Sequence, residues 1–284
     1  MNPTLLMAPL KALVLAAGRG ERMRPLTDHR PKPLLAVGGR PMIEWHLLAL
    51  AAAGVQEVVI NTAWLEDQFP ATLGDGRRFG LRLHYSMEGR DHGGALETAG
   101  AIAKALPLLG DCFWLVSGDI VAPGFAFDAA AARRFASGTD DAHLWLVPNP
   151  DFHTAGDFDW VDGRLQRPPA GQPRPWTYAN LALVRRTLVD GIRSGERAAL
   201  GPLLFASAAA GRLGGELLRG PWHNVGTPAQ LAAVDLDLSR AAAAAGAAGA
   251  GAAAGAAGAG AGAGAGEGAA AGAGEGAAAA AAAD

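Results

Sequence analysis

The sequence lacks several features that would each point to a class of protein. Its 284 residues contain one cysteine, Cys112, which excludes an intramolecular disulfide framework and a cysteine-based zinc site. No apolar run is long enough to cross a membrane, so we expect no membrane partner. The first nine residues lack the basic segment that opens a signal peptide. These features together predict a cytoplasmic protein.

The chain also has little net charge. It contains 24 Lys and Arg residues and 27 Asp and Glu residues, and three of those acids follow residue 240. Residues 1–240 therefore carry 24 charges of each sign. A neutral body argues against nucleic acid as a partner. A basic cluster within such a body is a local feature, which favours a small anionic ligand.

The last 44 residues have no side chain large enough to build a core. Residues 241–284 are all Ala or Gly except Glu267, Glu275 and Asp284. We expect a disordered low-complexity tail there, because frequent glycine opposes the helix that alanine favours. The folding unit is then residues 11–240, preceded by an N-terminal extension of residues 1–10.

Glycines and cations follow the first apolar run of the chain, residues 12–17. Gly18 and Gly20 let the loop turn sharply and bring its backbone N–H groups close to a ligand, where they can bind an anion. The cations of this region are Arg19, Arg22, Arg24 and Lys32. We interpret the loop as a polyphosphate site, although an ordinary turn with solvated arginines is the alternative. A dinucleotide fingerprint and a P-loop are excluded, because the third glycine and the Gly-Lys-Ser/Thr ending are absent.

Apolar segments of strand and helix type alternate through the first half. Strands are predicted over residues 11–17, 57–61, 81–86, 113–117 and 143–147, and helices over residues 41–53, 65–73, 96–106 and 129–136. This alternation predicts an α/β fold with a mostly parallel, Rossmann-like sheet and helices on both faces. Ligands of such sheets bind at the carboxyl ends of the strands.

The second half has a different pattern. Short antiparallel strands are predicted over residues 157–161, 164–166 and 177–184. Helices near residues 188–193 and 202–210, strands at 216–219 and 223–225, and a closing helix over 228–238 complete it. We expect this half to be an insertion that covers the sheet edge and completes the site.

Ser117-Gly118-Asp119 ends a predicted strand with a carboxylate. An Asp in that place is often a helix cap or a turn residue. Near a polyphosphate site, however, it can hold Mg²⁺, which prefers one or two carboxylates together with substrate phosphates. The seven histidines are scattered and show no metal-ligand spacing, so we expect them to be structural, with His92 and His153 the strongest exceptions.

Several spaced motifs resemble one family. They are Leu15-Ala16-Ala17-Gly18-x-Gly20-x-Arg22-Met23-x-Pro25-Leu26-Thr27, Pro31-Lys32-Pro33-Leu34 and Gly39-x-Pro41-Met42-Ile43. In this order they resemble the sugar-1-phosphate nucleotidyltransferases, also called nucleotide-sugar pyrophosphorylases. The resemblance extends from Lys11 to about Leu238. It implies the nucleotide-diphospho-sugar transferase type of fold, in which the small antiparallel part binds the sugar.

The resemblance also implies roles for individual residues. Arg22 and Lys32 would be catalytic, and Asp119 and Asn224 would hold Mg²⁺. The implied nucleotide-binding residues are Ala17, Gly18, Gly20, Glu21, Arg22, Lys32 and Gly100. The implied sugar-binding residues are Glu97, Ser117, Asn149, Asp157 and Asn180.

The implied reaction needs no protein nucleophile. An oxygen of a sugar 1-phosphate attacks the α-phosphate of a nucleoside triphosphate and pyrophosphate leaves, so catalysis consists of positioning and charge stabilisation. Within this family, the resemblance of four segments implies UTP and N-acetylmuramate 1-phosphate as substrates, which would yield a nucleotide sugar for recycling into cell-wall precursors. They are residues 16–24, Ile43-Glu44-Trp45-His46, residues 149–158 and Trp222-His223-Asn224-Val225-Gly226-Thr227. Mannose or glucose 1-phosphate with GTP or dTTP is the alternative.

Asn224 departs from the family pattern, which places Asp there. An amide keeps an oxygen ligand but loses a charge, so Mg²⁺ should bind less tightly. Asn180 likewise stands where a small glycine is expected, and Ala99 and Ala101 replace glycines. Two interpretations stay open: an active transferase with a weaker or single metal site, and a non-catalytic protein that binds a sugar nucleotide.

Overall fold

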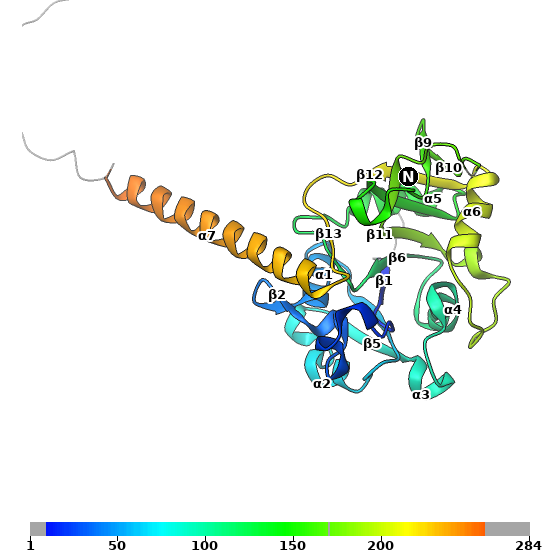
Figure 1. Cartoon of the computed structure of the whole chain (residues 1–284), viewed down its shortest axis with the longest axis horizontal. Coiled ribbons are helices and arrows are strands. Elements are labelled where there is room, and N and C mark those ends of the chain that lie inside the picture. Colours follow the sequence, from blue (N-terminus) through cyan, green and yellow to red (C-terminus); the bar gives the residue numbers. More distant parts are fainter. Residues whose placement is uncertain (1–9, 170, 259–284) are drawn as a thin grey trace, which may run out of the picture. The chain divides into compact units, whose positions relative to one another are not determined.

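The computed structural model describes residues 10–169 and 171–258. The chain divides into two compact units, Met1–Leu238 and Ser239–Asp284. The first unit is built on one nine-stranded sheet with the strand order β5-β4-β1-β6-β11-β8-β12-β10-β9 (Figure 1). The strands of this sheet are β1 Lys11–Leu15, β4 Glu57–Thr62, β5 Arg82–Met87, β6 Cys112–Ser117, β8 Ala142–Pro148, β9 Asp159–Val161, β10 Arg164–Gln166, β11 Trp176–Arg185 and β12 Leu213–Leu217.

Helices cover both faces of this sheet (Figure 1). The helices of the described residues, including α7, which is not one of the helices packed on the sheet, are α1 Met42–Ala52, α2 Gln68–Leu73, α3 Glu88–His92, α4 Glu97–Ala105, α5 Ala129–Ser137, α6 Gly201–Ala209 and α7 Pro228–Gly258. Successive residues of a strand point to opposite faces. Ala12 and Val14 of β1 therefore join the core under α1, α2 and α5, whereas Leu13 joins the core under α4 and α6. The α/β class and the helices on both faces are confirmed.

The parallel part of the sheet brings three strand ends together. β5, β4, β1 and β6 are mutually parallel neighbours. Leu15 at the end of β1 pairs with Asn61 on one side and Ser117 on the other. The loops that leave β1, β4 and β6 consequently share one edge of the sheet, which is where ligands of such sheets bind.

The second half of the chain enters the sheet instead of only covering its edge. β11 lies between β6 and β8 and is antiparallel to both. Its consecutive residues Leu181, Ala182, Leu183 and Val184 are buried, so both faces of the strand are apolar, which suits a central position. The expectation of an insertion at the edge was wrong for this strand, whereas β9 and β10 do form the sheet edge.

Other local differences have local causes. The helix expected over residues 188–193 is a short 3₁₀ turn, Arg186–Val189, followed by Asp190-Gly191, a pair that favours turns. β12 begins at Leu213, earlier than predicted, because Gly214-Gly215 obscures the strand pattern. The strand predicted at 223–225 is confirmed as β13 His223–Asn224, but its partner β7 Ile120–Val121 was not predicted, nor was the pair of β2 Ala36–Val37 with β3 Arg40–Pro41.

Helix α7 continues into the Ala/Gly segment and ends at Gly258. The described part of the expected disordered tail is therefore helical, because alanine has the highest helix propensity of all residues. Residues 259–284, like residues 1–9, lie outside the described residues. Within the described ranges, no helix combines the length and the apolar character needed to cross a membrane.

Candidate active site

A cavity of about 570 Å³ lies where the loops after β1, β4 and β6 meet. Its lining includes most of the residues expected to bind nucleotide. The expected residues found there are Ala17, Gly18, Gly20, Glu21, Arg22, Lys32, Glu97, Ser117 and Asp119. The structure thus brings the glycine loop and the cations Arg19, Arg22 and Lys32 to a single cavity, together with the carboxylate of Asp119.

Gly20 fixes the shape of the loop. Its φ is 65°, a left-handed conformation, and an added Cβ would lie 3.0 Å from Thr27 Cγ2 and 3.1 Å from Lys32 Cβ. Its carbonyl accepts hydrogen bonds from the Thr27 hydroxyl and the Met23 N–H, both at 2.8 Å. Met23 is fully buried and anchors the loop to the core. Only glycine fits this turn without strain.

Two arginines of the loop are held by neighbouring residues. The Arg19 guanidinium stacks on the Trp64 ring at 4.4 Å, and the Trp64 indole N–H donates to the Thr27 carbonyl. Arg22 lies against Gly226, where an added Cβ would be 3.3 Å from its Nη2 atom. Gly226 also lines the cavity, so the backbone near β13 leaves room for the Arg22 guanidinium.

Lys32 and Asp119 form an ion pair at the centre of the site. Lys32 Nζ lies 2.9 Å from Asp119 Oδ2, and the Ser117 hydroxyl donates to Asp119 Oδ1 at 2.7 Å. Burial opposes the charged form of Asp119, but the Lys32 ammonium and the Ser117 hydroxyl outweigh it and lower the pKa of this carboxyl. The Gly118 N–H donates to the Leu15 carbonyl, which holds Asp119 beside the end of β1.

A second cavity of about 630 Å³ adjoins the first. Leu15, Glu97, Thr98 and Ser117 line both. Of the residues expected to bind sugar or metal, Asp157, Asn180 and Asn224 also line the second cavity. Aromatic side chains complete its wall, namely Phe152, Phe158, Tyr178, Phe205 and Trp222; Phe152, Phe158 and Trp222 lie in the segments that favoured the substrate assignment, but none of the five was expected to bind a ligand. Polar groups beside aromatic faces are typical of small-molecule sites.

Asn180 and Asp157 owe their positions to the irregular centre of β11. Asn180 has a φ of 61°, and the β11–β8 register shifts between Tyr178 and Ala182. Asn tolerates this left-handed conformation better than most residues, which explains an Asn where a glycine was expected. Asp157 accepts hydrogen bonds from the Tyr178 N–H at 2.9 Å and from His153 Nε2 at 3.0 Å. His153, one of the two histidines that we expected not to be purely structural, therefore lies in the cavity wall.

Asn224 lies next to Asp119 through the β13–β7 pairing. Asn224 pairs with Ile120, and the Val225 N–H donates to the Asp119 carbonyl at 3.0 Å. Among the described residues, no group of three or more His, Cys, Asp or Glu side chains could hold a metal ion. One carboxylate with a neighbouring amide oxygen nevertheless suits Mg²⁺, because this ion takes further ligands from substrate phosphates and water. Asp119 and Asn224 therefore fit Mg²⁺ as a partial set of ligands, which substrate phosphates and water would complete.

Two of the expected residues lie outside the lining of both cavities. The Gly100 N–H donates to the Ala198 carbonyl, and an added Cβ would meet the Glu196 carbonyl at 2.3 Å. Asn149 donates to the Arg174 carbonyl at 2.7 Å and accepts from the Thr177 hydroxyl at 2.9 Å. In both cases the polar groups already bind the protein itself. Gly100 and Asn149 therefore support the walls of the site.

Asn61 was not among the expected residues, although it lines the first cavity. It is 3% exposed, and its Oδ1 atom accepts a 2.8 Å hydrogen bond from the Ala16 N–H. A polar residue at the end of an otherwise apolar strand was the available signal. Asn61 belongs to β4, which lies next to β1 in the sheet, and β1 leads into the glycine loop.

Comparison with known proteins gives a consistent result. Residues 11–151 match the family model described as Nucleotidyl transferase. The chain is 45% identical over 226 residues to the N-acetylmuramate alpha-1-phosphate uridylyltransferase of Neisseria meningitidis serogroup B, covering 78% of this chain and 95% of the relative. The enzyme of the same name from Caulobacter vibrioides is 36% identical over 242 residues, covering 80% of this chain and 96% of the relative.

The fold is also found among solved structures. The inositol-1-phosphate CTP transferase from T. maritima superposes with a TM-score of 0.64 at 17% identity, covering 82% of this chain and 96% of that one. A likeness at this identity concerns the fold. It agrees with the sheet and the strand-end cavity described above.

Proposed function

This chain belongs to the nucleotidyl transferase family, and from that premise we propose that it transfers a uridylyl group from UTP to N-acetylmuramate 1-phosphate and releases pyrophosphate. One observation carries the proposal. A cation-lined cavity and a polar, aromatic cavity adjoin at Ser117, next to the Lys32–Asp119 pair. The first would hold the triphosphate, and the second would hold the sugar.

The chain's own residues supply charge and orientation. Gly18 and Gly20 line the first cavity, and the backbone N–H groups of their turn would bind phosphate oxygens. Lys32 and Arg22 would neutralise the charge that develops as the sugar phosphate oxygen attacks the α-phosphate and pyrophosphate leaves in line. The attacking oxygen belongs to a phosphate, which is already ionised at neutral pH, so no protein base is needed. Sugar contacts would come from Asp157, Asn180 and Glu97.

Asp119 and Asn224 are the residues that would hold Mg²⁺. When bound, the ion would neutralise phosphate charge and fix the phosphates relative to one another. Asp119 supplies the single carboxylate, and Ser117 hydrogen-bonds to it and orients it. Lys32 is paired with the same carboxylate in this structure, so its ammonium is held within reach of any phosphate that approaches Asp119.

The second candidate acceptor is a 1-phosphate of a sugar that itself carries no charge, and one observation favours it. N-acetylmuramate carries a carboxylate, whereas the described residues that line the second cavity include Glu97 and Asp157 and no Lys or Arg. His153 is the lining residue that could carry a positive charge, and it is already paired with Asp157. Mannose or glucose 1-phosphate with GTP or dTTP would not need such a charge.

Residues 11–240 would contain the whole catalytic unit, because both cavities are lined by residues between Leu15 and Gly226. A cytoplasmic location follows from the substrates, since nucleoside triphosphates are abundant there.

A substrate panel tests the proposal. Purified protein with Mg²⁺ is given each pairing of UTP, GTP and dTTP with N-acetylmuramate, glucose and mannose 1-phosphates, and pyrophosphate release is measured. We expect the highest kcat/KM for UTP with N-acetylmuramate 1-phosphate. A preference for another pairing would replace the substrate assignment. No turnover with any pairing, with nucleotide binding retained, would favour the non-catalytic interpretation.

A further inference from the structure

A buried acidic residue lies behind the nucleotide cavity. Glu88 opens helix α3 and is fully buried. Within the described residues, its two carboxylate oxygens accept hydrogen bonds from uncharged donors, Asn61 Nδ2 at 2.8 Å and the Leu96 N–H at 2.8 Å. Burial raises the pKa of Glu88, and these two hydrogen bonds oppose the rise. A carboxylate in such a place is costly to the fold, so its contacts call for an explanation.

The contacts of Glu88 continue to the phosphate loop. Asn61 donates to Glu88 through its amide nitrogen and accepts from the Ala16 N–H through its amide oxygen, also at 2.8 Å. Ala16 is the first residue after β1, and Leu96 is the last residue before α4. A single hydrogen-bonded chain therefore joins the backbone of Ala16 to the backbone of Leu96.

Both ends of this chain adjoin the lining of the nucleotide cavity. Ala16, Ala17 and Gly18 line one wall, and Ala95, Glu97 and Thr98 line another. The Leu96 segment also bonds to the loop before α6, because the Leu96 carbonyl accepts from the Ala198 N–H at 3.0 Å. A change in the Asn61–Glu88 contact would consequently change the distance between the two walls.

We propose that Asn61 and Glu88 are positioning residues for the nucleoside triphosphate, whose buried hydrogen bonds set the spacing between the loop after β1 and the turn before α4. The pair acts through the backbone of Ala16 and Leu96, and the proposal rests on the proposed function. Hydrogen bonds fix distances to a fraction of an ångström, and a displacement of about 1 Å in the groups that position a substrate can cost about 100-fold in rate.

Exchanging the two polar groups provides a direct test. In Asn61→Asp two carboxylates face each other, so the hydrogen bond between residues 61 and 88 is lost. In Glu88→Gln the new amide has one acceptor oxygen in place of two, so it cannot accept from both Asn61 and the Leu96 N–H. The double variant Asn61→Asp/Glu88→Gln restores all three hydrogen bonds with the middle one reversed. Its new carboxylate accepts from the Ala16 N–H and from the new amide, whose carbonyl accepts from the Leu96 N–H.

The readouts are the Kd of UTP from calorimetry, which needs no turnover, and the KM for UTP. We expect each single variant to raise both values at least tenfold, and the double variant to return them to within threefold of the wild type. Single variants that fold and bind UTP like the wild type would overturn the proposal. Where a single variant fails to fold, the double variant decides: wild-type-like UTP binding supports the proposal, and loss of binding overturns it.

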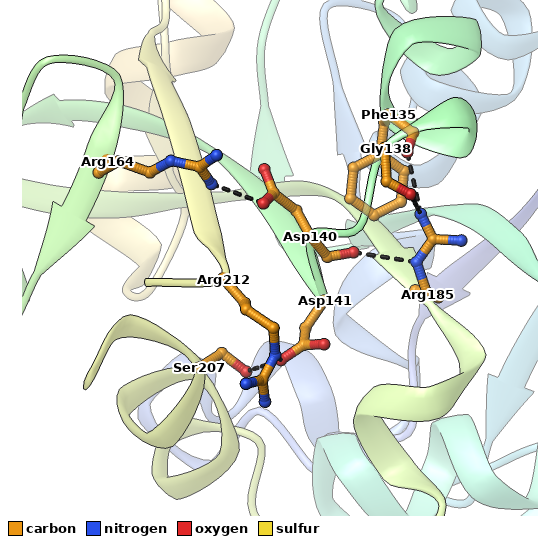
Figure 2. A network of polar contacts seen from close by, with 8 residues as sticks. All are labelled: Phe135, Gly138, Asp140, Asp141, Arg164, Arg185, Ser207 and Arg212. Carbon is orange, nitrogen blue, oxygen red and sulfur yellow. Dashed lines mark hydrogen bonds and ion pairs between the residues drawn. The ribbon is translucent and has the colours of Figure 1, made fainter. Parts of the chain in front are cut away.

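A matched control comes from a carboxylate far from the site along the strands. Asp141 accepts from the Ser207 hydroxyl at 2.7 Å and from Arg212 Nε at 3.0 Å, in the polar network shown in Figure 2. Asp141→Asn should lower the melting temperature and leave the Kd of UTP unchanged. An equal rise in the Kd of UTP in this control would show that destabilisation alone accounts for the effect at Glu88. Turnover by the wild type tests the proposed function separately, because UTP binding is measured without it.

Discussion

The Lys32 ammonium donates a 2.9 Å hydrogen bond to the Asp119 carboxylate, although the two residues are 87 positions apart. Lys32 follows the phosphate loop and Asp119 follows β6, so the parallel pairing of β1 with β6 makes the contact possible. The Lys32 side chain is 9% exposed, whereas that of Asp119 is 36% exposed. The cation is therefore held in place by the fold, and the carboxylate faces the cavity.

Replacing Lys32 tests its role in charge stabilisation. Lys32→Met keeps the length of the apolar stem and removes the ammonium. We expect kcat/KM for nucleotidyl transfer to fall about 100- to 1,000-fold, the range for losing one electrostatic group that stabilises a transition state. Steady-state kinetics measure this.

The matched control is Lys11→Met. Lys11 begins β1, at the opposite end of the strand from the loop, and its ammonium pairs with Glu57 at 3.4 Å. This surface pair contributes little to stability. Kinetics like those of the wild type are expected. A similar fall in kcat/KM in both variants would show that the loss does not depend on the position of Lys32.

Gly20→Ala tests the shape of the phosphate loop. The left-handed conformation costs a non-glycine residue about 1–2 kcal/mol, and the added methyl group would press on Thr27 and Lys32. We expect a loss of unfolding free energy of at least that size, together with weaker UTP binding. Denaturant titration and calorimetry measure the two effects.

Gly18→Ala is the control for that variant. Nothing lies within 4 Å of an added Cβ at Gly18, and its φ is not in the left-handed region. Its effect on unfolding free energy should stay within about 0.5 kcal/mol. If Gly18→Ala were as destabilising as Gly20→Ala, the geometry of Gly20 would not be the cause.

The loop and the parallel strands were predictable because their signals are local. Gly18, Gly20 and Lys32 lie within 15 residues of one another, and the apolar runs around them define strands directly. The central place of β11 was not predictable, because it depends on pairing Leu183 with Trp114 far away in the sequence. The Asn61–Glu88 contact was not predictable either, because it joins residues far apart in the sequence and neither residue belongs to a recognisable motif.

Gly100 and Asn149 show the limit of assigning residues by resemblance. Each stands in a segment that does adjoin the site, but the chain's own carbonyl groups at Ala198 and Arg174 occupy their donors. Each of these two hydrogen bonds is made to a segment more than 20 residues away in the sequence. Only the structure distinguishes a residue that lines the cavity from one that supports its wall.

His46 should make stability depend on pH. It is buried, and its Nε2 atom lies 2.8 Å from the Ile120 carbonyl, beside Asp119. Burial lowers the pKa of His46 from 6.5 to about 4. In the unfolded chain it would take up a proton as the pH falls below about 6.5, and in the folded protein only near pH 4. Stability is therefore lost as the pH falls across this window, by up to about 3 kcal/mol.

His46→Gln isolates that contribution, because the amide can still donate to the Ile120 carbonyl but does not titrate. The lowered pKa of Asp119 also reduces stability at low pH, so the quantity to compare is the difference between wild type and variant. Unfolding free energy measured from pH 7 to pH 4 should fall less steeply in the variant. Parallel curves would show that His46 is not the group responsible.

Asn224→Asp tests the place of the metal. A second carboxylate beside Asp119 should strengthen Mg²⁺ binding, so half-maximal activity should require about tenfold less Mg²⁺. Chelation with EDTA should abolish activity in the wild type and in the variant. An unchanged Mg²⁺ titration curve would show that residue 224 does not contact the ion.

The fate of an isotopic label tests nucleotidyl transfer most directly. The protein is incubated with Mg²⁺, N-acetylmuramate 1-phosphate and UTP labelled at the α-phosphate, or in a parallel reaction at the γ-phosphate. The account predicts that the α label appears in the nucleotide sugar and the γ label in pyrophosphate. Transfer of the γ label to the sugar phosphate, or release of the α label as UMP alone, would contradict it.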